Sequence, residues 1–203
     1  MEFLSDRHRD ALTEVVNIGI GRAASILSSM SRAPVGLQVP ELQVLPLNEV
    51  VRTIAERWSD KLVSVRMNFD GGFKGRTDLI FPSDSAAALV KALVGDIGPD
   101  MDLDTLRIAT LTEVGNVVIN GVLGSIGNVL NENLEYSVPD TREENAERLF
   151  SKREDSTDEP YAILARTGFT VDDLELSGEI VIIFDVGSIN SLVGALDSIL
   201  PAA

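Results

Sequence analysis

Two short segments of the chain each place a glutamate and an asparagine three residues apart: Glu14 with Asn17, and Glu113 with Asn116. In a helix, residues three apart project from one face, so the carboxylate and the carboxamide of each pair lie close together. A carboxylate can pair with a lysine or act as a base, and a carboxamide can hold a water molecule through an N–H donor and a carbonyl acceptor. The same pair is also typical of a polar stripe that faces solvent.

An internal repeat favours the functional interpretation. The segment LTEVVN at 12–17 recurs as LTEVGN at 111–116, and the dipeptide Val-Pro at 39–40 recurs at 138–139, in both cases 99 residues later. Two separate matches at one offset indicate a duplication. A solvated stripe has no physical reason to retain Glu and Asn in both copies while their neighbours change.

The first segment also fits a nucleotide-binding turn. Gly19, Gly21 and Ala24 match G-x-G-x-x-A, the turn that holds a dinucleotide pyrophosphate. The duplicate, NVVINGVL, keeps no glycine at the positions of Gly19 and Gly21. Apolar residues between 12 and 30 recur at intervals of three and four, as in a helix with one buried face. We therefore predict a long helix there and no nucleotide site.

Glycines inside the two predicted helices indicate that something approaches the backbone closely, because each costs about 1 kcal/mol relative to alanine. They are Gly19, Gly21, Gly121, Gly124 and Gly127. Packing of the two helices on each other and a bare surface for a partner protein both fit this pattern.

The rest of each half follows one order. Alternating segments predict strands, and each pair of strands precedes a helix, with Ser83 or Asp84 as one N-cap and Ser188 as the other. The predicted strands are 61–69, 75–81, 161–171 and 178–184. Each half is thus predicted as helix, short strand, two longer strands and helix. This order predicts an α+β fold, an antiparallel sheet flanked by long helices.

The whole chain, 1–203, is predicted to be a single pseudo-symmetric domain, with one repeat half at about 5–98 and the other at about 103–200. The halves differ mainly at 140–160, where 12 of the 21 residues are charged. That composition predicts a solvated insertion, a loop with one helical turn at most.

Composition excludes several classes of function. The net charge of −15 opposes binding to nucleic acids and to anionic membranes, and favours a basic partner. Absence of cysteine and a lone histidine, His8, predicted to be solvated, argue against zinc sites and Ser-His-Asp or Cys-His nucleophiles. We find no run of about 18 apolar residues and no signal-peptide pattern, so we expect no membrane span and a cytoplasmic location.

The repeated residues match a known motif. Each copy has a glutamate, an asparagine three residues on, and a proline 23 residues further: Glu14, Asn17 and Pro40 in the first, and Glu113, Asn116 and Pro139 in the second. With Asp10 before Glu14, this motif resembles the signature of the CheC, CheX and FliY phosphatases of chemotaxis. The resemblance covers nearly the whole chain and, with two copies, is CheC-like. It departs at Ala109, where the pattern has Asp or Ser.

The resemblance implies a protein aspartyl-phosphate phosphatase that acts on a phosphorylated CheY-like receiver. Each asparagine would orient the attacking water, and each glutamate would pair with the receiver's lysine. No cofactor of the chain's own is implied, and magnesium is expected on the receiver. The departure at Ala109 implies a second site that is weaker or recognises the partner differently. The implied partner-binding residues are Asp10, Gly21, Pro40, Asn120 and Pro139.

Two other functions stay open. The chain could be a non-catalytic interaction module whose helices dock a receiver in a signalling or motor-switch assembly. The family includes members that bind the deamidase CheD, which makes a CheD-type protein a candidate partner. A small-molecule enzyme with its own pocket is disfavoured, because no set of polar residues is predicted to converge outside the helices.

Overall fold

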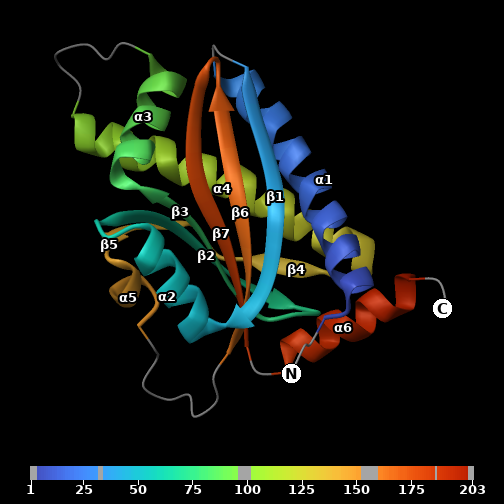
Figure 1. Cartoon of the computed structure of the whole chain (residues 1–203). Coiled ribbons are helices and arrows are strands. Elements are labelled where there is room, and N and C mark those ends of the chain that lie inside the picture. The colour runs from blue at the N-terminus through green and yellow to red at the C-terminus, as the bar shows by residue number, and fades with distance from the viewer. Residues whose placement is uncertain (1–3, 32–33, 96–101, 152–159, 186, 201–203) are drawn as a thin grey trace.

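The fold is a single antiparallel sheet with helices on both faces (Figure 1). A computed structural model of the chain describes residues 4–31, 34–95, 102–151, 160–185 and 187–200. The strands, in spatial order, are β1 (Val35–Pro46), β6 (Tyr161–Val171), β7 (Leu174–Phe184), β3 (Gly75–Pro82), β2 (Leu62–Gly71) and β4 (Leu134–Tyr136), with β5 (Asp140–Glu144) also paired to β2. All these pairs are antiparallel, which confirms the predicted α+β class.

Strands from the two halves of the chain complete each other in the sheet. The first-half strand β1 pairs with β6, and the second-half strands β4 and β5 pair with β2. The two central strands, β3 and β7, come from different halves as well. The hairpins β2–β3 and β6–β7 are therefore each bordered, on their outer side, by strands from the other half of the chain. The division into halves remains a prediction, and its boundary at 98 lies outside the described residues.

The two longest helices, α1 (Asp6–Met30) and α4 (Leu103–Leu130), confirm the predicted helices at the two Glu-Asn segments. A capping box starts α1: the Ser5 hydroxyl accepts from the His8 backbone N–H, and the Ser5 N–H donates to the His8 ring. Residues 13–18 are helical, so no strand leads into the Gly19–Ala24 segment as a nucleotide-binding turn requires.

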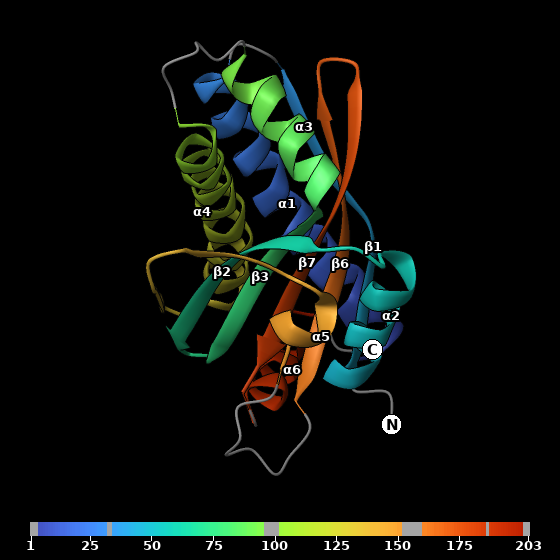
Figure 2. The same ribbon diagram turned by 90° about the vertical axis from the view of Figure 1, so that its left-hand side faces the viewer.

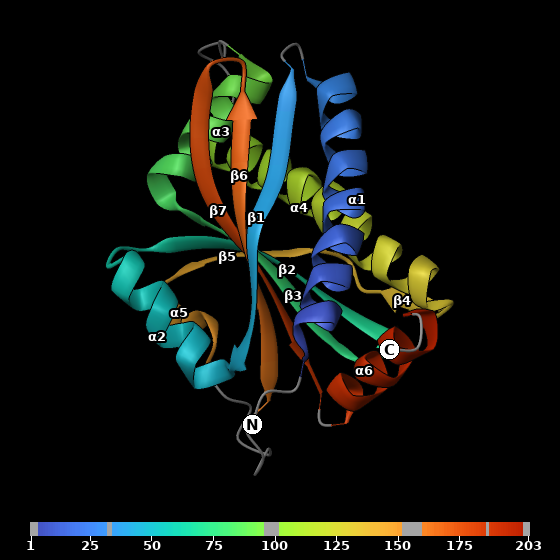
Figure 3. The same cartoon turned by 45° about the vertical axis from the view of Figure 1, so that its right-hand side comes forward.

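The helices α1 and α4 cross in direct backbone contact (Figure 3). A Cβ added at Gly19 would lie 2.3 Å from the carbonyl oxygen of Gly121, and one added at Gly121 would lie 2.7 Å from that of Gly19. Gly21 and Gly124, by contrast, have open space where a side chain would be. Close helix packing therefore accounts for Gly19 and Gly121, whereas Gly21 and Gly124 leave bare helix surface.

The helices divide between the two faces of the sheet (Figure 2). The long helices, with α3 (Ser83–Val94) and α6 (Ser188–Ile199), bury the larger hydrophobic core against one face. The shorter helices α2 (Leu47–Arg57) and α5 (Ala146–Leu149) cover a smaller core on the other face. The alternation of side chains along each strand supplies both cores.

The insertion at 140–160, predicted as a loop with one helical turn at most, does contain a single-turn helix, but its first residues form a strand and not a loop. Residues 140–144 form β5 and 146–149 form α5, and 152–159 lie outside the described residues. The charges there are compatible with a strand because β5 lies at the sheet edge, with most of its side chains exposed. The corresponding place in the first half holds α2, which was not predicted, and β1 is 12 residues long rather than short.

Three smaller predictions were also wrong. The N-caps of α3 and α6 are Pro82 and Gly187, because the serine hydroxyls bond elsewhere: Ser83 donates to the Lys61 carbonyl, and Ser188 accepts from the Lys74 N–H. His8 is not solvated. Its side chain is 13% exposed, and its Nε2 lies 2.9 Å from the Asp197 carboxylate of α6.

One described helix, α4, is long and apolar enough by length and composition alone to cross a membrane, which was not expected. In the fold it packs along α1 and against β2, and 39% of its most apolar window is buried. Its apolar side chains, among them Val118 and Val122, belong to the larger core. We therefore interpret α4 as a core helix.

Candidate functional site

Each long helix presents its glutamate on the face opposite its buried stripe and its asparagine at the edge of that face. Glu14 and Glu113 are exposed, and Asn17 and Asn116 are half-buried. The apolar positions between them, such as Val15 and Val114, are buried in the core. This burial of one face fixes the opposite face outward, as the periodicity predicted.

The carboxylates are available to a partner. Among the described residues, no cation or hydrogen-bond donor is paired with Glu14 or Glu113. Asp10 is likewise exposed, one turn before Glu14, whereas the exposed Ala109 stands one turn before Glu113. The first helix therefore presents two acids and the second presents one.

The amide of Asn17 is held by the backbone of Val39. Its Nδ2 donates to the Val39 carbonyl at 3.3 Å, and the Val39 N–H donates to its Oδ1 at 3.1 Å. The register between β1 and β6 shifts between Gln38 and Glu41, so Val39 has no paired residue in β6. Pro40 has no N–H to give to a ladder, which suits it to such a bulge. Asn17 thus supplies the hydrogen bonds that the bulge removes, a role that the sequence did not predict.

The amide of Asn116 has a different partner. Its Oδ1 accepts from Asn120 Nδ2 at 2.8 Å. Val138, which corresponds to Val39 in the repeat, is 86% exposed between β4 and β5, followed by the half-buried Pro139. At this break between β4 and β5, the bonds to β2 come from Ser137 and not from a side-chain amide of α4. The Asn68 N–H donates to the Ser137 hydroxyl, and the Ser137 N–H donates to the Asn68 carbonyl. The position of Asn120 corresponds to Gly21 in the first helix, which has no side chain to offer.

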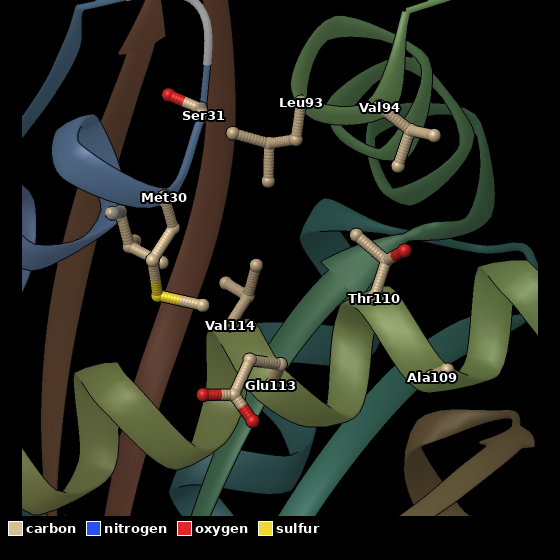
Figure 4. A pocket seen from close by; sticks show the side chains of 9 residues that line it. Met30, Ser31, Leu93, Val94, Ala109, Thr110, Glu113 and Val114 are labelled. Atoms are coloured by element: carbon tan, nitrogen blue, oxygen red, sulfur yellow. The ribbon is translucent and has the colours of Figure 1, made fainter.

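A cavity of about 270 Å³ lies beside Glu113 (Figure 4). It is formed where the last turns of α1 and α3 meet the first half of α4. Its lining residues are Leu27, Met30, Ser31, Leu93, Val94, Ala109, Thr110, Glu113 and Val114. Figure 4 shows Glu113 rising from α4 beside Met30, with Ala109 and Thr110 along the same helix. No feature of the sequence singled out this cavity, because its walls come from three separate segments.

Charged side chains also converge on the opposite face of the sheet, contrary to prediction. Arg66 lies across from Asp78 and Asp140 on neighbouring strands, and Arg166 lies across from Glu179 and Glu41. Each arginine thus lies between two acids on three neighbouring strands, which are β5, β2 and β3 in one row and β1, β6 and β7 in the other.

Asp78 and Glu179 are fully buried in these rows and are paired. Asp78 accepts from Arg66 at 2.7 Å and from Ser64 at 2.8 Å, and Glu179 accepts from Arg57 at 3.2 Å. Burial raises the pKa of the Glu179 carboxyl, against the opposing effect of the nearby arginines. Because each buried acid has an arginine against it, Arg66 and Arg76 at Asp78 and Arg57 at Glu179, we interpret the rows as structural. Among the described residues, no group of three or more His, Asp or Glu side chains could hold a metal ion.

Two curated proteins of Bacillus subtilis (strain 168) are similar to the chain in sequence. The flagellar motor switch phosphatase FliY is 25% identical over 138 residues, 67% of this chain and 35% of FliY. The CheY-P phosphatase CheC is 25% identical over 142 residues, 68% of this chain and 66% of CheC. The chain therefore spans about a third of the length of one relative and about two thirds of the other. No protein-family profile matches it.

Solved structures share the fold. FliY of Thermotoga maritima superposes with a TM-score of 0.76 at 18% identity, covering 96% of this chain and 98% of that one. FliM from the FliM–SpeE complex of H. pylori gives 0.70 at 13% identity, covering 96% and 97%. A chain of the CheX–CheY–BeF3–Mg complex of Borrelia burgdorferi gives 0.50 at 15% identity, covering 85% and 99%.

The chain therefore has the fold of FliY and of FliM, an antiparallel sheet covered by helices on both faces. Together with the two sequence relatives, this confirms the resemblance to the FliY and CheC phosphatases that the sequence indicated: the chain is similar to both in sequence and to FliY in fold.

Proposed function

We propose that the chain is a phosphatase for the aspartyl phosphate of a CheY-like receiver, with Asn17 and Asn116 orienting water and Glu14 and Glu113 pairing with the receiver's lysine. The observation that carries the proposal is the presentation of an unpaired carboxylate one helical turn from an amide on both long helices. Both curated relatives are named as phosphatases, and CheC is named for CheY-P.

The chemistry suits such a small set of groups. An acyl phosphate is already reactive, and phosphoryl transfer depends mainly on placement and charge stabilisation. The receiver would bring its own magnesium, as in the CheX–CheY complex that contains Mg and the phosphoryl mimic BeF3. The helper then needs only an amide to align a water and an acid to hold the helix in register, and no cofactor of its own. Such a partner also implies that the chain acts in the cytoplasm.

The two amides differ in how many hydrogen-bonding positions they keep. A carboxamide has two N–H donors and two acceptor lone pairs. Asn17 uses one of each on Val39, whereas Asn116 uses a single lone pair on Asn120. We infer that Asn116 is the freer amide and that the second site turns over faster. This ranking is the reverse of the one that Ala109 suggested.

The test is phosphate release from a phosphorylated CheY-like receiver of the same organism, with magnesium and with catalytic amounts of this chain. We expect acceleration over the receiver's own hydrolysis, a large loss in Asn116→Ala and a complete loss in the Asn17→Ala/Asn116→Ala double variant. Undiminished acceleration by the double variant would rule out the amide mechanism.

One observation favours a second candidate function for α1. Because Asn17 is engaged with Val39, the first helix could dock a receiver or a CheD-type protein without turnover. Binding of the phosphorylated receiver that survives in Asn116→Ala, with no hydrolysis, would support this division between a binding helix and a catalytic helix.

A further inference from the structure

The cavity beside Glu113 is lined mainly by apolar side chains that are incompletely covered. Met30 is 57% exposed and Val94 is 36% exposed, on opposite sides of it. Ile26, exposed one turn before Met30 on α1, extends this apolar rim. An apolar hollow with a few polar groups at its edge is the usual form of a binding site, and its exposure is unfavourable while nothing fills it.

The position of Ala109 makes this rim apolar. At the corresponding place on the first helix, Asp10 adds a second acid beside Glu14. On the second helix Ala109 forms part of the cavity wall, and Glu113 is left as the single charged group of the lining. The charge and shape together fit an apolar side chain that lies next to a cation. The departure from the motif at Ala109 then has a structural consequence beyond the loss of an acid.

Resting on the function proposed above, we propose that this cavity receives an apolar side chain of the receiver, next to the lysine that pairs with Glu113. The second site is then a two-point dock, with one ionic contact and one apolar contact beside Asn116. The first site, with Asp10 in place of Ala109, would dock its receiver by charge. A volume of about 270 Å³ is sufficient for one large side chain.

The experiment uses the full chain carrying Asn17→Ala, so that hydrolysis reports on the second site. Ala109→Leu fills the cavity from an exposed position, and Val94→Ser removes an apolar wall. Val129→Ser is the matched control, because Val129 is 37% exposed and lies near the other end of α4, about 24 Å from Glu113 along the helix. The probe is a CheY-like receiver of the same organism loaded with BeF3 and magnesium.

We expect the Kd for this receiver to rise about tenfold in Ala109→Leu and in Val94→Ser, as loss of one buried apolar contact would produce. Val129→Ser should bind within about twofold of the parent. At saturating phosphorylated receiver, kcat should be unchanged in all three, because none touches Asn116. Thermal unfolding checks that each variant is folded.

Two results would overturn the proposal. If both cavity variants bound the receiver as tightly as the control, the cavity would not be part of the dock, although loss of hydrolysis in Asn116→Ala would still support the phosphatase function. If Val94→Ser changed self-association in sedimentation but left receiver binding intact, the occupant would be a second copy of this chain. Hydrolysis that persisted in the Asn17→Ala/Asn116→Ala double variant would instead contradict the phosphatase mechanism, while the Kd comparison would still decide whether the cavity belongs to the dock.

Discussion

Asn17 and Val39 hydrogen-bond to each other twice, side chain to backbone, and so fasten α1 to the bulge in β1. The Glu-Asn motif and the Val-Pro motif, far apart in sequence, therefore meet in the first half of the fold. In the second half the same motifs stay apart, with Asn116 bonded to Asn120 and Val138 exposed. This difference separates the structural from the catalytic contribution of each amide.

Replacement of each amide by alanine should affect stability unequally. Asn17→Ala leaves the N–H and carbonyl of the buried Val39 unpaired, and should lower the free energy of unfolding by about 1–3 kcal/mol. Asn116→Ala removes no contact with the backbone of a strand, and should change it by less than about 0.5 kcal/mol. Urea unfolding of the two variants measures both, and equal destabilisation would contradict the distinction.

Asn120 is expected to act through Asn116 as a positioning residue. Asn120→Ala removes the donor that orients the Asn116 amide, and should lower kcat at the second site about tenfold with KM unchanged. In a background that already carries Asn116→Ala, the same change should have no further effect, since the coupled partner is absent. A rise in KM alone would indicate that Asn120 contacts the receiver instead.

The role of Glu113 in docking can be separated from catalysis by its charge. Glu113→Gln keeps the shape of the side chain but loses the charge-assisted bond to a lysine, so KM for the phosphorylated receiver should rise about tenfold while kcat is retained. The difference from the parent should shrink at high salt, because screening weakens the ionic contact. Kinetics at two ionic strengths provide the check, and a fall in kcat with unchanged KM would argue for a base instead of an anchor.

Two glycines in one helix should respond oppositely to alanine. At Gly19 the added methyl would collide with the Gly121 backbone, and we expect a loss of about 2 kcal/mol or more in stability. At Gly21 nothing lies within 4 Å, so alanine should stabilise the helix by about 0.5–1 kcal/mol. Thermal unfolding distinguishes the two. Stabilisation at both positions would mean that the helices do not cross at Gly19.

Glu179 should make stability depend on pH in a defined direction. Burial raises its pKa in the folded state above the ordinary 4.5, so folding favours the protonated carboxyl. The contribution of the protonated Glu179 to the free energy of unfolding is fully present below the unfolded-state pKa, and it is lost as pH rises through the raised folded-state pKa. Relative to Glu179→Gln, the unmodified chain should therefore gain stability as pH falls from 7 towards 4. Urea unfolding across that range tests the sign, and a gain with rising pH would contradict it.

The sequence by itself determined the features that depend on local periodicity. The spacing of apolar residues predicted both long helices and their exposed glutamates, because burial of one stripe leaves the opposite stripe exposed. It did not predict that the asparagines are half-buried. Alternation predicted the four strands of the two hairpins, and β6 matches its prediction at both ends, Tyr161 and Val171. The offset of the repeat linked Val39 to Val138, which lie at the bulge in β1 and at the break between β4 and β5.

Only the tertiary structure decided which of these elements pair with each other. Periodicity records that a face is buried, but not by what, so nothing in β1 indicated that its partner is β6 of the other half. The clamp of Asn17 on Val39, the buried pairing of Arg66 with Asp78 and the cavity beside Glu113 all join segments distant in the chain. Such contacts depend on the closure of the whole sheet, and the same Glu-Asn motif therefore acquired two different surroundings.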